Sequence, residues 1–332
     1  MPPANRGQPA AGATPIATVT VTTAAAAETQ AVAPAGAAAG LAAGRGEWLL
    51  IGALALIWSS SFGMIKIGVE SIPPISLAFG RMAIGGLLLA AVALWQRDRL
   101  PTAPRDWLGA LAVGLFGNAL PFSLIGWGEL HVDSGLAAIF MGAMPIVVLL
   151  MAHLFTHDER LTGGRALGVG CGFAGLIMLV GWQALEGIGE ALWAQLALFA
   201  AACCYATSTM VVRRVVRHRG TSMAALATLA GALLLAPLAL WLEAPLDSSP
   251  TSASLWALLG LGLLPTALAT LIYFRLLGRI GVNVFAQVNY LIPILGVLWG
   301  ALLLGEQPGW RELIALALIL GGMAIVNREA RR

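Results

Sequence analysis

Charged residues are scarce in this chain. Asp, Glu, Lys and Arg make up only 11% of the 332 residues, against roughly 25% in an ordinary soluble domain. Hydrophobic residues make up 59%, and long apolar runs recur from Trp48 to Asn327. A run of about 20 such residues can cross the hydrocarbon core of a bilayer. The sequence therefore excludes a soluble domain and predicts an integral membrane protein. Its net charge of +3 is small, so no nucleic-acid partner is expected.

Cysteine is also rare, and the common motifs of enzymes and metal sites are missing. Cys171, Cys203 and Cys204 lie in apolar runs without a CxxC or histidine-paired spacing. We interpret them as small buried side chains with no metal or redox role. The chain has no ATP-binding loop, no HExxH zinc pair and no serine, histidine and acid set in chain order. We therefore expect neither an enzyme nor a bound cofactor.

Large apolar side chains are almost absent from the first 46 residues, which are mainly Ala, Pro, Gly and Thr. Such a segment cannot bury enough apolar surface to offset the entropy of ordering it. Residues 1–46 are therefore predicted to be a disordered cytoplasmic tail. The basic start and compact leucine-rich core of a cleaved signal peptide do not occur before Trp48. Membrane insertion is thus assigned to the first helix.

The apolar windows and their Gly, Pro and charge breaks predict an all-α membrane protein with ten transmembrane helices. The predicted helices are 48–68, 75–95, 107–128, 134–155, 165–183, 191–212, 221–242, 254–276, 283–304 and 309–327. Every connection between them is short. Any function must therefore be carried out within the helix bundle.

The basic residues of the loops favour one orientation. With the amino terminus in the cytoplasm, the inner connections hold almost all the loop arginines and the outer loops hold only Arg311. Acidic residues such as Glu70, Glu129 and Asp133 then collect outside. An even number of helices also returns the carboxyl terminus, residues 328–332, to the cytoplasm.

The two halves of the chain resemble each other. WSSSFGMIK from Trp58 aligns with YATSTMVVR from Tyr205, GNALP from Gly117 aligns with PTALA from Pro265, and MPI aligns with IPI, always at an offset of 147 or 148 residues. Each half contains five helices, an odd number, so the second half enters the membrane from the opposite side. The sequence therefore predicts an inverted repeat with units at 47–183 and 191–327.

These features together resemble a known family. The WSSSF element, the arginine in LAFGRMAIG, and the stretches MPIVVLLMAHLFTHDER and YLIPILGVLWGALLLGEQ are similar to those of EamA-type transporters of the drug/metabolite transporter superfamily. The resemblance covers about residues 48–327. It implies a ten-helix alternating-access carrier in the bacterial inner membrane, in a family whose members mostly export small metabolites.

Polar and helix-breaking residues cluster at one depth in the predicted bundle. At a rise of 1.5 Å per residue they lie near the bilayer midplane. They are Trp58, Asn118, Tyr205, Thr266, Pro145 and Pro293. Proline frees a backbone carbonyl that needs a partner, so such breaks are tolerated mainly beside protein or a wet cavity. The equivalent prolines predict hinges around a central cavity; kinked packing helices are the alternative.

Further polar residues are candidates for lining this cavity. Ser59 shares a face of the first helix with Lys66, and Gln287 and Tyr290 share a face of the ninth. Hydrogen bonds between helices explain these residues equally well. Arg81 either orients an anionic substrate group, gates the outer mouth or bonds to backbone carbonyls. Lys66 lies near the outer boundary, where snorkelling to water explains it.

Acidic residues are missing from the predicted midplane, because Glu129 and Asp133 are expected in an outer loop. Proton coupling through a buried carboxylate is therefore not supported by the sequence. Facilitated diffusion, or coupling by another route, is the expectation.

The leading functional hypothesis is a secondary transporter that exports small polar metabolites such as amino acids. The alternatives are a lipid scramblase or flippase and a non-transporting membrane scaffold. The expected partners are a small-molecule substrate and the lipid bilayer. Glycine-rich helix faces also leave a homodimer open.

Overall fold

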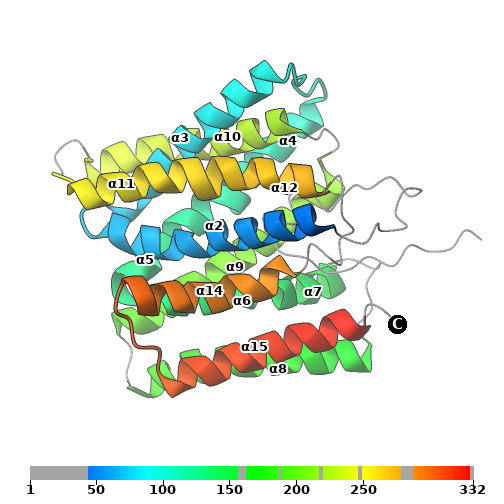
Figure 1. Ribbon diagram of the computed structural model, residues 1–332, viewed down its shortest axis with the longest axis vertical. Coiled ribbons are helices and arrows are strands. Elements are labelled where there is room, and N and C mark those ends of the chain that lie inside the picture. Colours follow the sequence, from blue (N-terminus) through cyan, green and yellow to red (C-terminus); the bar gives the residue numbers. More distant parts are fainter. Residues whose placement is uncertain are drawn as a thin grey trace, which may run out of the picture.

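A computed structural model describes residues 44–155, 162–186, 189–216, 220–245, 249–277 and 287–329. The described residues form a bundle of helices that run roughly parallel or antiparallel to one another (Figure 1). The predicted tail at 1–46 lies outside the described residues except for 44–46, and so do residues 330–332 of the carboxyl-terminal tail.

The transmembrane segments agree with the predicted all-α, ten-helix architecture. In the described part of the chain, nine helices are long and apolar enough to cross a membrane, and Val288–Leu303 is a shorter apolar helix. The segments are α2 (Arg45–Val69), α3 (Pro74–Trp95), α4, η1 and α5 (Pro104–Val113, Gly114–Ala119, Leu120–His131), α6 and α7 (Ser134–Gly142, Met144–Phe155), α8 (Gly163–Glu186), α9 (Glu190–Arg214), α10 and η2 (Thr221–Leu238, Ala239–Glu243), α11, η3 and α12 (Ser252–Leu261, Gly262–Leu268, Ala269–Leu277), α14 (Val288–Leu303) and α15 (Trp310–Glu329). The first residues of the predicted helix 283–304 lie outside the described residues.

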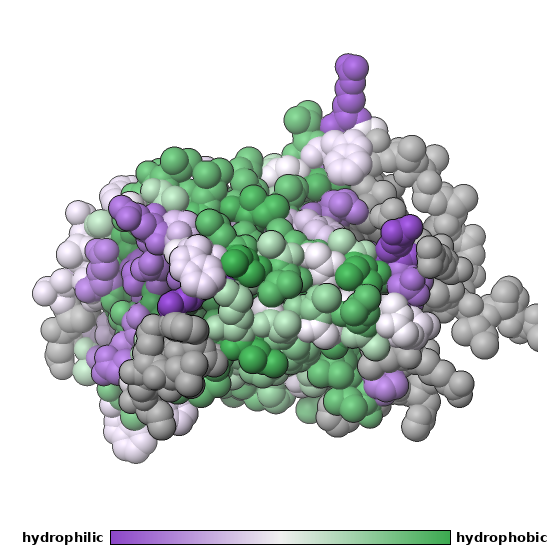
Figure 2. Space-filling view, turned by 90° about the horizontal axis from the view of Figure 1, so that it is seen from below, coloured by the Kyte–Doolittle hydropathy of each residue, from purple (hydrophilic) through white to green (hydrophobic). Residues whose placement is uncertain are grey.

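The outer surface of the bundle suits a lipid environment. Hydrophobic residues cover the middle of the face shown in Figure 2, and hydrophilic residues gather toward its two ends. Large apolar side chains such as Leu94, Trp241 and Trp256 are mostly exposed. In water such a surface would be unfavourable, whereas hydrocarbon solvates it.

Backbone irregularities recur at equivalent positions of the two halves. The third helix of each half contains a stretch of π-helix, η1 (Gly114–Ala119) and η3 (Gly262–Leu268). The second helix of each half ends at a residue with positive φ, Arg97 at 54° and Ala244 at 41°. These pairs are offset by 148 and 147 residues. The repeat seen in the sequence therefore extends to the details of the backbone, and the units are inverted as expected for five helices each.

Glycines allow the helices to touch backbone to backbone. A Cβ atom added to Gly114 would lie 2.5 Å from the carbonyl oxygen of Ala227 on α10. A Cβ atom added to Gly168 on α8 would lie 2.7 Å from the carbonyl oxygen of Gly322 on α15. Small residues at such crossings let van der Waals contact hold helices together where lipid provides no hydrophobic drive. These glycine faces are used within the chain, and a homodimer stays a prediction.

The second helices of the two halves, α3 and α10, cap each other. Glu243, after α10, accepts hydrogen bonds from the amides of Ile75 and Ser76 at 3.0 and 2.6 Å, at the first turn of α3. Asp98, after α3, accepts one from the amide of Ser222 at 2.9 Å, at the first turn of α10. A carboxylate at a helix amino terminus satisfies orphan amides and complements the helix dipole. Each helix therefore anchors the other at opposite ends of the bundle.

Candidate functional site

A cavity of about 150 Å³ lies between the two halves of the bundle. Its walls come from α2, α3, η1, α5, α6 and α7 of the first half, and from α9, α10, η3, α12 and α14 of the second. The last helices of the two halves, α8 and α15, pack against each other away from it (Figure 1). The cavity thus lies at the repeat interface, where carriers of this architecture bind substrate.

The cavity wall follows the internal symmetry. Residues at equivalent positions of the two halves line it together. The pairs are Trp58 with Tyr205, Arg81 with Thr228, Gly117 with Pro265, Asn118 with Thr266, Phe122 with Thr270, and Ile125 with Tyr273. Two of these pairs belong to the π-helical stretches, whose wider turns displace side chains from the usual register and often mark functional sites.

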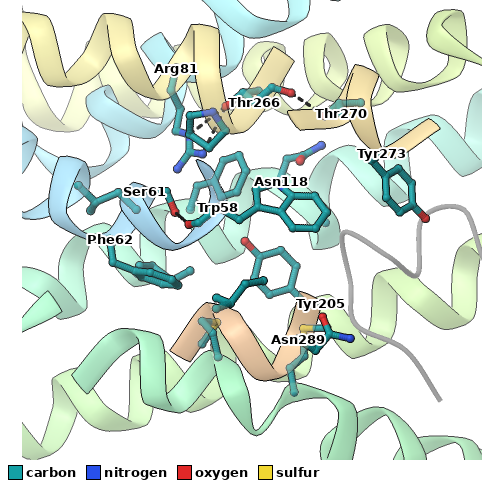
Figure 3. Close-up of a pocket in the computed structure, with 18 of the residues that line it drawn as sticks. Trp58, Ser61, Phe62, Arg81, Asn118, Tyr205, Thr266, Thr270, Tyr273 and Asn289 are labelled. Atoms are coloured by element: carbon teal, nitrogen blue, oxygen red, sulfur yellow. Dashed lines mark hydrogen bonds between the residues drawn. The ribbon is translucent and has the colours of Figure 1, made fainter. Parts of the chain in front are cut away.

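Arg81 brings a positive charge into this cavity (Figure 3). Its side chain is 4% exposed, and its Nε and Nη2 atoms each lie 3.3 Å from Oγ1 of Thr266. The guanidinium carbon lies 3.9 Å from the centre of the Phe122 ring. Among the described residues, no carboxylate forms an ion pair with it. A guanidinium has five N–H donors, so donors are left that can bind an anionic ligand.

Thr266 links this arginine to the π-helix. Its hydroxyl donates to the carbonyl of Leu261 at 2.7 Å and accepts from Arg81. Its own carbonyl accepts from the hydroxyl of Thr270 at 2.6 Å. The irregular backbone of η3 is thus hydrogen-bonded to side chains of the cavity wall, as a backbone break within a membrane requires.

Aromatic rings form the rest of the wall. The ring centres of Trp58 and Tyr273 are 6.1 Å apart, and those of Tyr273 and Phe274 are 5.6 Å apart. Tyr205 on α9 and Asn289 on α14 lie across the cavity from Arg81 and Thr266 (Figure 3). The cavity therefore combines one cation, several hydroxyl and amide groups, and an apolar surface. A small molecule with an anionic head and an apolar part suits this lining.

The serines of the first helix act mainly within it. The hydroxyls of Ser59, Ser60 and Ser61 donate to the carbonyls three residues earlier, at 3.1, 2.9 and 2.6 Å. Ser59 is fully buried and accepts a hydrogen bond from Nε1 of Trp299 on α14 at 3.0 Å. Ser61 is the one of the three that lines the cavity. The prediction that Ser59 lines the cavity is therefore corrected, since its face of α2 packs on α14.

Three other predicted site residues lie off the cavity wall: Tyr290, Gln287 and Pro145. The face of α14 that lines it is formed by Asn289, Ile292 and Pro293, which share one side because they are three and four residues apart. Tyr290 points elsewhere, and its hydroxyl accepts from Nδ2 of Asn327 at 2.6 Å. Gln287 stands at the start of α14.

Pro145, the predicted hinge of the first half, is the second residue of α7 and does not line the cavity, whereas Pro293 does. A proline in the first turn of a helix removes no helical hydrogen bond. The short break between α6 and α7 just before it is the irregularity that this half provides.

Several lining residues were missed by the sequence analysis. Thr270 and Tyr273 follow Thr266 at the spacing of one helix face, and this spacing is a signal that the sequence contained. Thr228 is equivalent to Arg81 at an offset of 147 residues. Carrying the repeat through Arg81 would have found Thr228, and the helix face of Thr266 would have found the other two.

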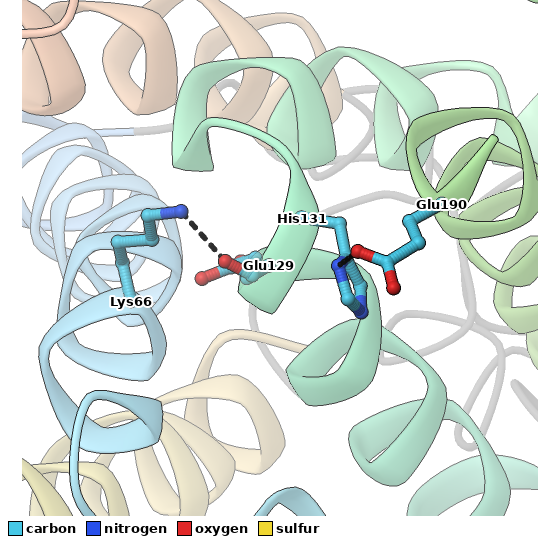
Figure 4. A network of polar contacts seen from close by, with 4 residues as sticks. All are labelled: Lys66, Glu129, His131 and Glu190. Carbon is cyan, nitrogen blue, oxygen red and sulfur yellow. Dashed lines mark hydrogen bonds and ion pairs between the residues drawn. The ribbon is translucent and has the colours of Figure 1, made fainter.

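A second cluster of polar residues, which includes Lys66 and Glu129, lies at one end of the bundle (Figure 4). Glu306 lies at the same end, which we call the Glu306 end. Lys66 donates from Nζ to the main-chain oxygens of Glu129 and Val132 at 2.6 and 2.9 Å. It thus caps the carboxyl terminus of α5, where carbonyls lack helical partners. The interpretation of Lys66 as a side chain that snorkels to water is therefore replaced by a contact between helices.

Glu129 does not lie in a loop as expected. Helix α5 continues to His131, and Glu129 is 0% exposed. The predicted helix ended at residue 128, one residue before it. The carboxyl group expected in an outer loop is thus buried near the end of a helix. Neighbouring His131 is less enclosed, with Nδ1 3.2 Å from Oε2 of Glu190.

Glu306 joins the two halves at the same end. Its carboxylate accepts hydrogen bonds from the amides of Ser134 and Gly135 at 2.8 and 3.0 Å, at the first turn of α6. Asp133 precedes this turn; burial raises the pKa of its carboxyl, the Glu306 charge raises it further, and the Lys66 charge opposes both. The residue equivalent to Glu306 in the first half is Glu159, at an offset of 147, and it lies outside the described residues.

Metal binding has no support in the described part of the chain, where no group of three or more His, Cys, Asp or Glu side chains could hold an ion. Cys171, Cys203 and Cys204 are free thiols. The chemistry available at the cavity is therefore that of a binding site: charge, hydrogen bonds and apolar contact.

Comparisons with known proteins agree with this architecture. The transporter YoaV of Bacillus subtilis, described as uncharacterized, is 26% identical over 274 residues, which are 82% of this chain and 91% of YoaV. The uncharacterized inner membrane transporter YedA of Escherichia coli is 28% identical over 276 residues, 83% of this chain and 88% of YedA. A probable terminal-alkyne amino-acid exporter of Streptantibioticus cattleyicolor is 26% identical over 282 residues, 85% of this chain and 93% of the exporter.

A solved crystal structure shares the fold, with a TM-score of 0.62 and 24% identity over 87% of this chain and 99% of the other. The model of the EamA-like transporter family matches residues 45–181 and again residues 192–328. The two matches correspond to the two halves whose backbones and cavity residues repeat. The chain therefore belongs to the EamA-like transporter family, and it is a multi-pass membrane transporter rather than an enzyme.

Proposed function

We propose that this protein is a secondary transporter of the bacterial inner membrane that exports small polar metabolites, with amino acids as the substrate class. The observation that carries the proposal is the guanidinium of Arg81, which has no carboxylate partner among the described residues, in an aromatic-lined cavity between two inverted repeats. Opening this cavity alternately to the two sides moves a bound molecule across the membrane.

Arg81 binds the carboxylate of the substrate in this proposal. Its position is fixed by Thr266 on one side and by the Phe122 ring on the other, so little side-chain entropy is lost on binding. Asn118 and Tyr205 offer hydrogen bonds to the amino group and other polar atoms, and Trp58 contacts the apolar part. The relative from Streptantibioticus cattleyicolor, described as a probable amino-acid exporter, supports this substrate class.

The loops and a relative support the proposed orientation and location. The placement of arginines supports a cytoplasmic position for both termini and an outer position for the Glu306 end. YedA, described as an inner membrane transporter, supports the membrane. Pro293 and the π-helical stretches η1 and η3 are the proposed hinges, because their backbones lack regular helical hydrogen bonds.

The test is untargeted metabolite analysis of the medium of cells that express the wild type or Arg81→Gln at matched membrane levels. Tyr290→Phe is the matched control, since Tyr290 lies on α14 beside the cavity residue Asn289 but off the wall. The proposal expects one class of carboxylate-bearing compounds to accumulate with the wild type and the control, and not with Arg81→Gln. Indistinguishable media would contradict export, and fluorescent-lipid translocation in liposomes would then test the scramblase alternative.

A further inference from the structure

Glu129 is a fully buried acidic residue whose carboxyl group has no partner. The residue is 0% exposed, and neither Oε1 nor Oε2 accepts or donates a hydrogen bond among the described residues. Its main-chain oxygen, in contrast, is bonded to Lys66. An ionised carboxylate removed from water without donors is strongly unfavourable. In this conformation the geometry therefore favours a carboxyl group that carries a proton.

The charged groups around Glu129 come from three elements. Lys66 on α2, Arg81 on α3 and Glu306 after α14 are close enough for their charges to act on it. Asp133 lies further along the chain toward the bundle end, and Glu190 on α9 contacts His131 instead. The two cations stabilise an ionised Glu129, and Glu306 opposes it. The carboxyl group therefore lies among charges of both signs.

Lys66 can exchange between two partners. It now bonds to the main-chain oxygen of Glu129, and the carboxyl group of the same residue is the second partner that we infer for it. If Glu129 loses its proton, Lys66 gains an ionic partner and leaves the carbonyls at the end of α5. The corner between α5 and α6, which Glu306 and Lys66 now hold, is then less restrained.

Helix α5 joins this carboxyl to the cavity. Phe122 and Ile125 line the cavity, and Glu129 follows Ile125 by four residues on the same face. That separation is one turn, or about 6 Å along the helix. The equivalent positions of the second half, Leu276 and Leu277, carry no acid. The third helix of the first half therefore carries an acid that the third helix of the second half lacks, at the end of the cavity that is nearest to the Glu306 end.

We propose that Glu129 is the proton-binding site that couples export to the proton gradient. On the outer side its carboxylate takes a proton from hydronium: one O–H bond of hydronium breaks, one carboxyl O–H bond forms, and a water molecule leaves. On the inner side the carboxyl O–H bond breaks and the proton passes through the cavity to water, while substrate leaves in the opposite direction. The coupling rests on the proposed export function, whereas proton binding at Glu129 does not.

Infrared spectroscopy of the purified full-length protein tests proton binding without any substrate. Spectra are compared for the wild type and Glu129→Gln over about pH 5 to 9, with Glu190→Gln as the control at an exposed acid. We expect a protonated-carboxyl band that disappears reversibly as pH rises, persists in Glu190→Gln and is missing from Glu129→Gln. Identical spectra for the wild type and Glu129→Gln at every pH would overturn the assignment.

Proteoliposomes test the coupling, with a radiolabelled mixture of the proteinogenic amino acids as the probe. We expect Glu129→Gln to exchange labelled for unlabelled amino acids like the wild type, because exchange needs no net proton movement, but to lose accumulation driven by a pH gradient. Accumulation at the wild-type level in Glu129→Gln would contradict the coupling. If the wild type itself neither exchanges nor accumulates the mixture, the amino-acid export proposal and its coupling fail, and the infrared result still decides proton binding.

Discussion

In the first repeat Arg81 brings a positive charge to the cavity, whereas the equivalent position of the second repeat is Thr228. Both residues line the same wall, and the helices that carry them, α3 and α10, cap each other at opposite ends. The two halves thus share a backbone arrangement but differ in the charge of the side chain that each brings to the cavity. The shared arrangement places equivalent helices around one cavity, and the difference gives the cavity a cation from the first repeat and a neutral hydroxyl from the second.

The same contrast holds for the buried acid. Glu129 ends the third helix of the first half, and the second half has Leu276 and Leu277 there. Repeat symmetry therefore accounts for the paired π-helical stretches and for the position of the cavity. In the function proposed above, residues that break the symmetry determine what the cavity binds.

The largest effect is expected from making the first repeat like the second with Arg81→Thr. Hydrogen bonds to a charged group contribute about 1.5 to 3 kcal/mol, so we expect amino-acid transport to fall roughly tenfold to hundredfold. Thr228→Ala removes a neutral group at the equivalent position of the second repeat and has a smaller effect. Transport rates at matched amounts of folded protein are the measurement. Equal effects of the two substitutions would contradict the asymmetry.

The glycines that begin the two π-helical stretches, Gly114 and Gly262, differ in the atoms that surround them. A Cβ on Gly114 would lie 2.5 Å from a main-chain oxygen of α10, whereas one on Gly262 would meet the side chain of Ile84 at 2.6 Å. A side chain can move more easily than a backbone, so Gly114→Ala is expected to destabilise by about 1 to 3 kcal/mol and Gly262→Ala by less. Thermal unfolding in detergent measures the order, and the reverse order would refute the packing argument.

The smallest effect is expected at the reciprocal caps. Glu243 accepts from two amides and from the hydroxyl of Ser76, whereas Asp98 accepts from the amide of Ser222. Removing a cap costs about 0.5 to 2 kcal/mol, so Glu243→Ala should lower the unfolding temperature more than Asp98→Ala. A larger loss in Asp98→Ala would show that the two ends are held by other contacts.

The sequence predicted the helices and the repeat because both depend on signals that one chain contains. Hydropathy gives the length of each span, and an odd number of helices per unit determines the inversion. Depth along a helix also follows from counting residues. Trp58, Asn118, Tyr205 and Thr266 were found in this way, and the structure brings them to one cavity.

Rotation about the helix axis was the part that hydropathy did not provide. Ser59, Gln287 and Tyr290 have the predicted depth, but their side chains lie on faces that pack against other helices. In a membrane both the lipid-facing and the packed sides of a helix are apolar, so the hydrophobic pattern hardly distinguishes them. The end of α5 shows a second limit, because a helix only three residues longer than predicted moves Glu129 from a loop into the interior.

The most direct test of a carboxylate-binding cavity at the repeat interface is exchange of radiolabelled amino acids in proteoliposomes that contain the wild type or Arg81→Gln. The account predicts that the wild type exchanges amino acids, that decarboxylated analogues do not compete, and that Arg81→Gln exchanges at a rate near that of empty liposomes. Exchange by Arg81→Gln at the wild-type rate, or equal competition by the decarboxylated analogues, would contradict the central role of Arg81.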